Sequence, residues 1–412
     1  MLFAILLPLL AALCLWRSHK SNARRRLIGN LPTSKAQGVF VGLVELKGTA
    51  ESESPLRSFL AEQECVLYRF FVSEKWQRQV TEEYVDQQGR RQTRLRTESG
   101  WTTVLQGGED TPFYLHDDTG VVLVRPEGAE IRPLTLFSQT CGPDDPLYHA
   151  KGPPGMVAHS AGVRSFTETG IPLHHALFVV GQARERPDVV AAELAHENEA
   201  PLFLVTVESE EGVLSRMGWS THLLNVLGLL FAGLGGWLLG KGDLAWVLAA
   251  SGIYLGAWFV TWFFLVFNAL VDVRNRMRQG WSAVEVQLKR RHDLIPQLAV
   301  VVDGLRSHER EAQEGLAALR AEMAPGADAP SGRVFHGVAR KVRLVSEKCP
   351  QLMADGAFRQ LQAQLVETEQ RIALARTYFN DIATAYNTRL EIVPDGWIAR
   401  LFGFARQPLL HA

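Results

Sequence analysis

The chain has 412 residues, with 43 lysines and arginines against 44 aspartates and glutamates, so its formal net charge is −1. This balance gives no electrostatic reason to expect nucleic acid as a partner. The cysteines stand singly, without a Cys-x-x-Cys pair or a histidine at zinc-finger spacing, which argues against a structural zinc site and fits a reducing compartment. We therefore expect no metal or cofactor. The cysteines are Cys14, Cys65, Cys141 and Cys349.

The first 16 residues are apolar, and basic residues follow them rather than precede them. Arg17, Lys20 and residues 24–26 come directly after, the reverse of the charged front of a cleaved signal peptide. As a helix the segment would reach about 24 Å, against about 30 Å for the hydrocarbon core of a bilayer. We predict an uncleaved transmembrane anchor at residues 1–16 with its N-terminus outside. The alternative is a signal peptide with an unusual charge layout.

Residues 27–216 are predicted to form a β-rich domain of mostly antiparallel α+β architecture. Runs rich in β-branched and aromatic residues alternate there with turn residues, and Lys151–Gly155 reads as a surface loop. The predicted strands are 39–46, 65–72, 92–105, 113–115, 121–124, 177–180 and 202–207.

His116, Asp117 and Asp118 are the candidate ligand or metal site of this domain, with Trp76 as a further candidate. A histidine beside carboxylates has the chemistry to bind a divalent ion. However, adjacent residues on a strand point to opposite faces, and an Asp-Asp-Thr-Gly turn at 117–120 satisfies its own backbone. A hairpin turn is therefore the favoured interpretation.

Two apolar segments, 221–240 and 244–267, are each long enough to cross a bilayer, and three residues separate them. They predict a tight transmembrane hairpin. Arg216 precedes it and three arginines follow it, so the positive-inside rule places both flanks in the cytoplasm. Small residues at every fourth position predict close helix packing. The arginines that follow are Arg274, Arg276 and Arg278, and the small residues are Gly228, Ala232, Gly236, Gly252 and Gly256.

Residues 268–404 are predicted to form an all-α antiparallel bundle of three or more helices with coiled-coil-like spacing. Apolar residues recur every three or four positions in two segments, and the first pattern skips only Arg291. A further amphipathic helix is expected at 333–348, after a loop at 324–332. The core positions expected in the first segment are Met277, Trp281, Val284, Leu288, Ile295, Leu298, Val302 and Leu305. Those in the second are Phe358, Leu361, Leu365, Thr368, Ile372, Ala375, Phe379, Ile382 and Tyr386.

The bundle also contains the candidate interaction residues. A basic cluster is suited to an acidic partner, although it begins about 30 Å along a helix from the bilayer, which argues against direct headgroup contact. The competing interpretation is pairing of Arg290 or Arg291 with Asp293, Glu391 or Asp395 inside the bundle. The candidates are Gln287, Lys289, Arg290, Arg291, Asp293 and Arg389.

Two parts of the chain also resemble known protein families. Pro112-Phe-Tyr-Leu-His-Asp-Asp-Thr-Gly120 and Val122-Leu-Val-Arg-Pro-Glu-Gly-Ala-Glu130 resemble the GIDE domain of the mitochondrial ubiquitin ligase Mulan/MAPL, and Ser54–Arg57 and Leu177–Ala183 occur in the order of that family. The ligase activity of that family resides in a separate RING domain with eight Cys/His zinc ligands. The scattered cysteines of this chain do not support a ligase function.

The C-terminal part resembles the LemA family. Gln287-Leu-Lys-Arg-Arg-His-Asp-Leu-Ile-Pro-Gln-Leu298 and Tyr386-Asn-Thr-Arg-Leu-Glu-Ile-Val-Pro394 look like its two signature segments, and Ile398–Phe404 extends the second. The resemblance implies a helical bundle attached to a membrane by one preceding helix. It supplies no reaction or catalytic residue.

The sequence therefore predicts a non-enzymatic scaffold or adaptor of the bacterial inner membrane, with both soluble domains in the cytoplasm and a role in envelope maintenance. Its expected partners are the lipid bilayer and an unidentified protein, and not nucleic acid. One alternative is an enzyme with a ligand or metal site at His116–Asp118 and Trp76. Another is a membrane-remodelling protein that acts as a homo-oligomer through its bundle.

Overall fold

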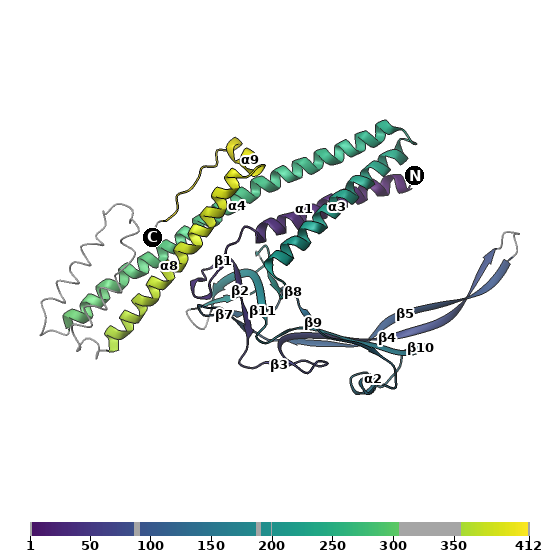
Figure 1. Cartoon of the computed structure of the whole chain (residues 1–412), viewed down its shortest axis with the longest axis horizontal. Coiled ribbons are helices and arrows are strands. Elements are labelled where there is room, and N and C mark those ends of the chain that lie inside the picture. The colour runs from purple at the N-terminus through teal and green to yellow at the C-terminus, as the bar shows by residue number, and fades with distance from the viewer. Residues whose placement is uncertain (1, 86–90, 187–190, 199, 305–355, 411–412) are drawn as a thin grey trace. The chain divides into compact units, whose positions relative to one another are not determined.

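The computed structural model describes residues 2–85, 91–186, 191–198, 200–304 and 356–410. The chain divides into two compact units (Figure 1). The β-rich unit comprises residues 41–210, and the helical unit comprises residues 1–40 and 211–412. The predicted loop at 324–332 and helix at 333–348 lie outside the described residues.

One sheet of the β-rich unit closes on itself. Its strands pair in the order β2-β6-β7-β12-β11, and β11 pairs again with β2 to complete the ring. Strands β13 and β8 extend it from β11. Val44, Leu46, Phe113, Val179 and Leu194 are buried in this part of the unit. The strands are β2 (Gly42–Glu51), β6 (Phe113–His116), β7 (Val121–Val124), β8 (Glu130–Arg132), β11 (Ala176–Glu185), β12 (Ala192–Leu194) and β13 (Leu204–Thr206).

The second sheet has the order β3-β4-β10-β9, and β5 pairs with β4. Tyr68, Phe70, Val72 and Phe166 are buried in its core, where aromatic and β-branched side chains suit a half-buried strand. The short helix α2 (Pro146–Ala150) follows β9 and is capped by the Asp145 carboxylate. The strands are β3 (Leu56–Arg57), β4 (Glu64–Val85), β5 (Arg91–Asp110), β9 (Leu134–Cys141) and β10 (Ser160–Pro172).

Strands β4 and β5 continue as a two-stranded ribbon beyond Trp76, the last β4 residue paired with β10 (Figure 1). Most strand pairs of the unit are antiparallel, while β7–β12 and β8–β13 are parallel. The mostly antiparallel β-rich domain predicted from the sequence is therefore confirmed.

The helical unit begins with α1 (Leu2–Ile28), which lies antiparallel to α3 (Glu210–Leu239). Ser18 Oγ donates to Asn225 Oδ1 over 2.6 Å, and Thr221 Oγ1 donates to Ser21 Oγ over 3.2 Å. A Cβ on Gly235 would lie 3.0 Å from Pro8, so the apolar parts of the two helices lie at the same level. The short elements β1 (Thr33–Ser34) and η1 (Ala36–Gly38) follow α1.

Helix α3 packs closely against α4 (Leu244–Gly304) through the small residues of α3. A Cβ on Gly228 would collide with the Tyr254 ring, and one on Gly236 would lie 2.5 Å from the Trp246 carbonyl oxygen. The packing predicted for these glycines is confirmed. It is wrong for Gly252 and Gly256, because a Cβ on either would meet nothing within 4 Å.

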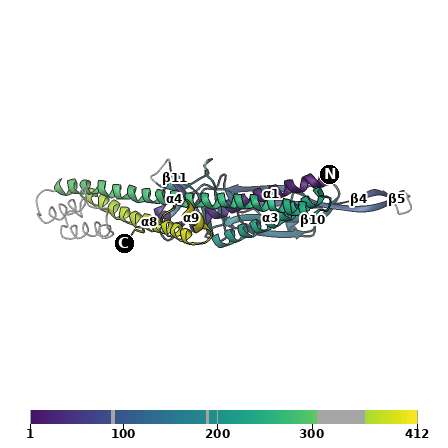
Figure 2. The same cartoon turned by 90° about the horizontal axis from the view of Figure 1, so that it is seen from above.

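Helix α4 runs unbroken for 61 residues, through Pro296, from the apolar segment into the bundle. It lies antiparallel to α8 (Gly356–Glu391), as Figures 1 and 2 show. Val284 and Ile382 are buried between the helices. The core position predicted for Trp281 is wrong, because its side chain is exposed and only its ring edge meets Phe379, with ring centroids 5.7 Å apart. Of the core positions predicted on α8, all are buried except Leu361, which is half-buried. This part of the bundle prediction is confirmed.

The end of the chain folds back along α8. After α9 (Asp395–Leu401), the segment 404–410 runs antiparallel to α8, and Phe404 and Leu410 pack against its core. The Asn387 amide donates to the Gln407 carbonyl over 2.8 Å and accepts from its N–H over 2.9 Å. Asn380 binds the backbone of Leu410 in the same two-bond manner. Two side-chain amides thus hold an extended tail.

Two described helices, α3 and α4, are long and apolar enough to cross a membrane. Only 22% and 28% of their most apolar windows are buried, so neither has the surroundings of a core helix in a soluble protein. Residues 2–16 of the predicted anchor form the first part of α1. Their role as a third span stays a prediction.

Candidate functional site

The predicted interaction residues 287–293 do not form one patch, because they follow one another around α4. Lys289 and Asp293 are exposed, Gln287 and Arg290 are half-buried, and Arg291 is only 4% exposed. Burial lowers the pKa of Arg291, and the nearby Glu369 carboxylate opposes that shift. The position that interrupts the apolar pattern is thus a buried arginine, and it offers no surface to a partner.

The expected pairing inside the bundle differs from the observed one. Asp395 binds neither Arg290 nor Arg291, but lies 3.5 Å from Arg26 Nη1 and 3.8 Å from Arg389 Nη1. Glu391 pairs with Arg406 at 2.7 Å. The reason is helix register. The antiparallel helices place Arg291 near Glu369, whereas Glu391 is the last residue of α8 and Asp395 is the first of α9.

Arg389 instead belongs to a polar cluster at the end of the apolar helices. Asp272 accepts from Arg276 Nε over 2.9 Å, and it also acts electrostatically on Arg389. The pKa of Arg389 is lowered. Burial is the main cause and the positive charge of Arg26 adds to it, whereas the carboxylates of Asp395 and Asp272 act in the opposite direction. We call Arg26, Asp272, Arg276, Arg389 and Asp395 the junction cluster. It joins α1, α4, α8 and α9.

The candidate site at His116–Asp118 is a turn. The Asp117 carboxylate accepts from Thr119 N over 2.7 Å and from Gly120 N over 3.0 Å, and Asp117 N donates to the Gly120 carbonyl. The hairpin interpretation is confirmed. Trp76 lies in the other sheet, where its ring covers Gly100 and lies 5.6 Å from the Arg78 guanidinium. The structure does not bring these candidates together.

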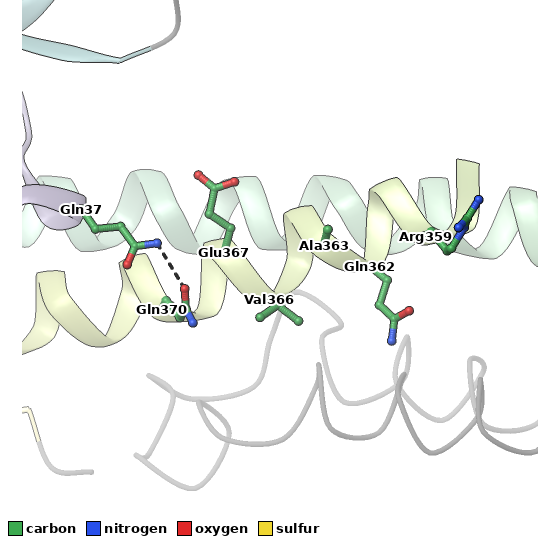
Figure 3. A pocket seen from close by; sticks show the side chains of 7 residues that line it. All are labelled: Gln37, Arg359, Gln362, Ala363, Val366, Glu367 and Gln370. Carbon is green, nitrogen blue, oxygen red and sulfur yellow. Dashed lines mark hydrogen bonds between the residues drawn. The ribbon is translucent and has the colours of Figure 1, made fainter. Parts of the chain in front are cut away.

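Among the residues that the structure describes, no three His, Cys, Asp or Glu side chains gather so as to hold a metal ion. A hollow of about 500 Å³ lies on α8 beside η1 (Figure 3). Gln37 Nε2 donates to Gln370 Oε1 across its rim over 3.2 Å. Its lining side chains are half-buried or exposed, so we assign no ligand to it. The lining residues are Gln37, Arg359, Gln362, Ala363, Val366, Glu367 and Gln370.

The β-rich unit contains a buried ion pair that the sequence motifs did not indicate. Arg164 Nε donates to Glu74 Oε2 over 3.0 Å, and its remaining nitrogens donate to the carbonyls of Tyr148, Pro153 and Gly155. Both charged side chains are at most 1% exposed. Arg164 thus fixes the loop after α2, and its setting is structural.

Two further buried carboxylates also bind locally. Glu168 accepts the backbone N–H groups of residues 59–61, and Glu193 accepts from Arg125 and Arg184. Burial alone would raise the pKa of Glu193, but the two arginines outweigh it and lower that pKa. A sequence signal existed for β10, because Arg164 and Glu168 alternate with Phe166 on the buried face.

Comparison with known proteins agrees with this architecture. The LemA family model matches residues 280–412, and the GIDE model, described as E3 Ubiquitin ligase, matches residues 81–240. The chain is also 25% identical over 203 residues to the magnetosome protein MamQ of Magnetospirillum gryphiswaldense, with 42% of this chain and 74% of MamQ covered. Both models thus match parts of the chain whose motifs resemble those families.

Proposed function

We propose that the chain is a membrane-anchored adaptor that presents its two domains on the cytoplasmic face of a bacterial inner membrane, in envelope maintenance. The observation that carries this proposal is the continuity of α4. Its first part is apolar and exposed, and its second part forms the bundle with α8. A single helix therefore couples the membrane to the domain that would bind a partner.

The exposed surfaces of α1, α3 and α4 support insertion into lipid. Leu9, Leu230, Ile253 and Phe259 are each more than half exposed. Hydration of such side chains costs about 25 cal/mol per Å², and soluble proteins rarely expose contiguous patches of this kind. A bilayer would cover them.

The proposed orientation follows from charge. Arg25 lies against Gly218 of α3, so the basic end of α1 is at the same level as Arg216. The α3–α4 turn lies at the opposite end of the apolar helices from Arg216. Helix α4 therefore returns to the level of Arg216, and its arginines after residue 270 lie at that level too. The positive-inside rule places this end in the cytoplasm and the N-terminus outside.

Single-cysteine labelling in a background without native cysteines tests the membrane arrangement. Asp243→Cys in the α3–α4 turn should react with an impermeant maleimide from outside the cell. Ser99→Cys on β5 should react only after permeabilisation, and the protein should resist carbonate extraction from membranes. Release of the protein from membranes by carbonate would contradict the proposed insertion. Labelling of Ser99→Cys from outside the cell, with Asp243→Cys protected, would contradict the proposed orientation.

In-cell crosslinking with affinity capture tests the adaptor role. The double variant Lys289→Glu/Arg290→Glu changes the accessible basic residues and leaves the buried Arg291 in place. A partner captured by the native protein and by the control Arg278→Glu, but lost by the double variant, would support binding through the bundle. Failure to enrich any specific partner would count against the adaptor. Enzymatic activity in the β-rich unit and oligomeric membrane remodelling stay alternative predictions.

A further inference from the structure

The junction cluster holds more positive charge than its carboxylates neutralise. Arg26, Arg276 and Arg389 face two acids, Asp272 and Asp395. The lowered pKa of Arg389 agrees with this excess, because burial and Arg26 outweigh the two carboxylates.

Two guanidinium nitrogens of the cluster are buried without a hydrogen bond. Arg276 is 7% exposed and its Nε is bound to Asp272, yet its Nη1 has no hydrogen-bond partner among the described residues. The same holds for Arg389 Nη1, since Asp395 Oδ2 at 3.8 Å is beyond hydrogen-bond distance. Buried charged donors are normally satisfied, so both nitrogens call for an acceptor.

The place of the cluster in the fold indicates which acceptor it suits. Asp272 follows Leu270, where the apolar stretch of α4 ends, and α9 packs there through Ile398 against Val266 and Leu270. At a membrane surface this is the level of lipid headgroups. Guanidinium groups bind phosphate oxygens with short, charge-assisted hydrogen bonds.

From these observations we propose that the junction cluster is a binding site for a phosphate group, with Arg276 and Arg389 as its donors. Its source is the headgroup of an anionic phospholipid or a free phosphate. Asp272 and Asp395 orient the two arginines and limit the affinity. Only the lipid source rests on the membrane insertion proposed above.

Native mass spectrometry of the full chain in phosphatidylcholine nanodiscs with added phosphatidylglycerol tests the lipid source. Calorimetric titration of the lipid-stripped protein with inorganic phosphate tests the free source. Arg389→Gln should weaken binding at least tenfold in whichever of the two experiments detects it. Arg278→Gln should not weaken it, because Arg278 is an exposed arginine of α4, two residues after Arg276. Asp395→Asn should strengthen binding, because it removes a competing negative charge.

The opposite signs separate a binding site from misfolding, since structural damage would weaken binding in both variants. Lipid retention that follows this pattern supports the lipid source, and phosphate binding that follows it supports the free source. Equal binding by the native protein and Arg389→Gln in both arms would overturn the proposal. Failure of membrane insertion in carbonate extraction would refute the proposed function but leave the phosphate titration decisive for this site.

Discussion

At the scale of single residues, the chain places arginines in three different buried settings. Arg164 has a carboxylate and three carbonyls as partners, and Arg291 is buried beside Glu369. Arg276 keeps a nitrogen without a hydrogen bond among the described residues. Each of the three has a carboxylate nearby, Glu74, Glu369 or Asp272, because an uncompensated buried charge is costly.

The Arg164–Glu74 pair gives a prediction for stability. Arg164→Met should lower the free energy of unfolding by about 3–5 kcal/mol, because it leaves Glu74 as a buried, uncompensated charge. Denaturant unfolding of the full chain in detergent, followed through tryptophan fluorescence, measures the effect. The double variant Arg164→Met/Glu74→Met should recover much of the loss. A single variant as stable as the native protein would contradict the structural role given to Arg164.

At the scale of elements, close packing of α3 on α4 gives a matched pair of substitutions. Gly228→Leu should destabilise the helix pair by about 1–3 kcal/mol, since the new side chain must displace the Tyr254 ring. Gly252→Leu should be nearly neutral, because nothing lies within 4 Å of its Cβ position. Thermal unfolding in detergent compares the two variants. Equal losses of stability would show that the helices pack differently from the structure.

The tail on α8 gives a second prediction at this scale. Asn387→Ala removes two hydrogen bonds to Gln407 and should weaken tail docking by about 1–2 kcal/mol. Hydrogen exchange at the amides of residues 407–410 should then be roughly tenfold faster. The exposed Asn275→Ala on α4 is the control and should leave these amides protected. Unchanged exchange in Asn387→Ala would mean that apolar contacts alone hold the tail.

At the scale of the whole molecule, the β-rich unit has its own closed sheet and its own core. Residues 41–210 alone should therefore unfold cooperatively, and Arg164→Met should destabilise the excised unit as it does the full chain. Circular dichroism with thermal unfolding measures both effects. An excised unit without cooperative unfolding would show that it depends on the helical unit.

Local pattern was enough to predict the elements whose periodicity is regular. Heptad spacing on α8 predicted Phe358, Leu365 and Tyr386 as core residues, because a 3.6-residue period fixes which face is buried. Turn chemistry likewise predicted the hairpin at 117–120. The two family motifs were also readable, since both are contiguous in the sequence.

What the sequence by itself determined is therefore local: the β-rich region, the apolar segments, the heptads and the two domain types. Only the tertiary structure decided which charges meet, as in the junction cluster, where Arg26, Asp272 and Arg389 come from helices far apart in the chain. The physical reason is that the spacing of apolar residues over a few positions is enough to show which face of a helix or strand is buried. Charge pairing instead depends on helix register and on side chains hundreds of residues distant, which no local pattern encodes.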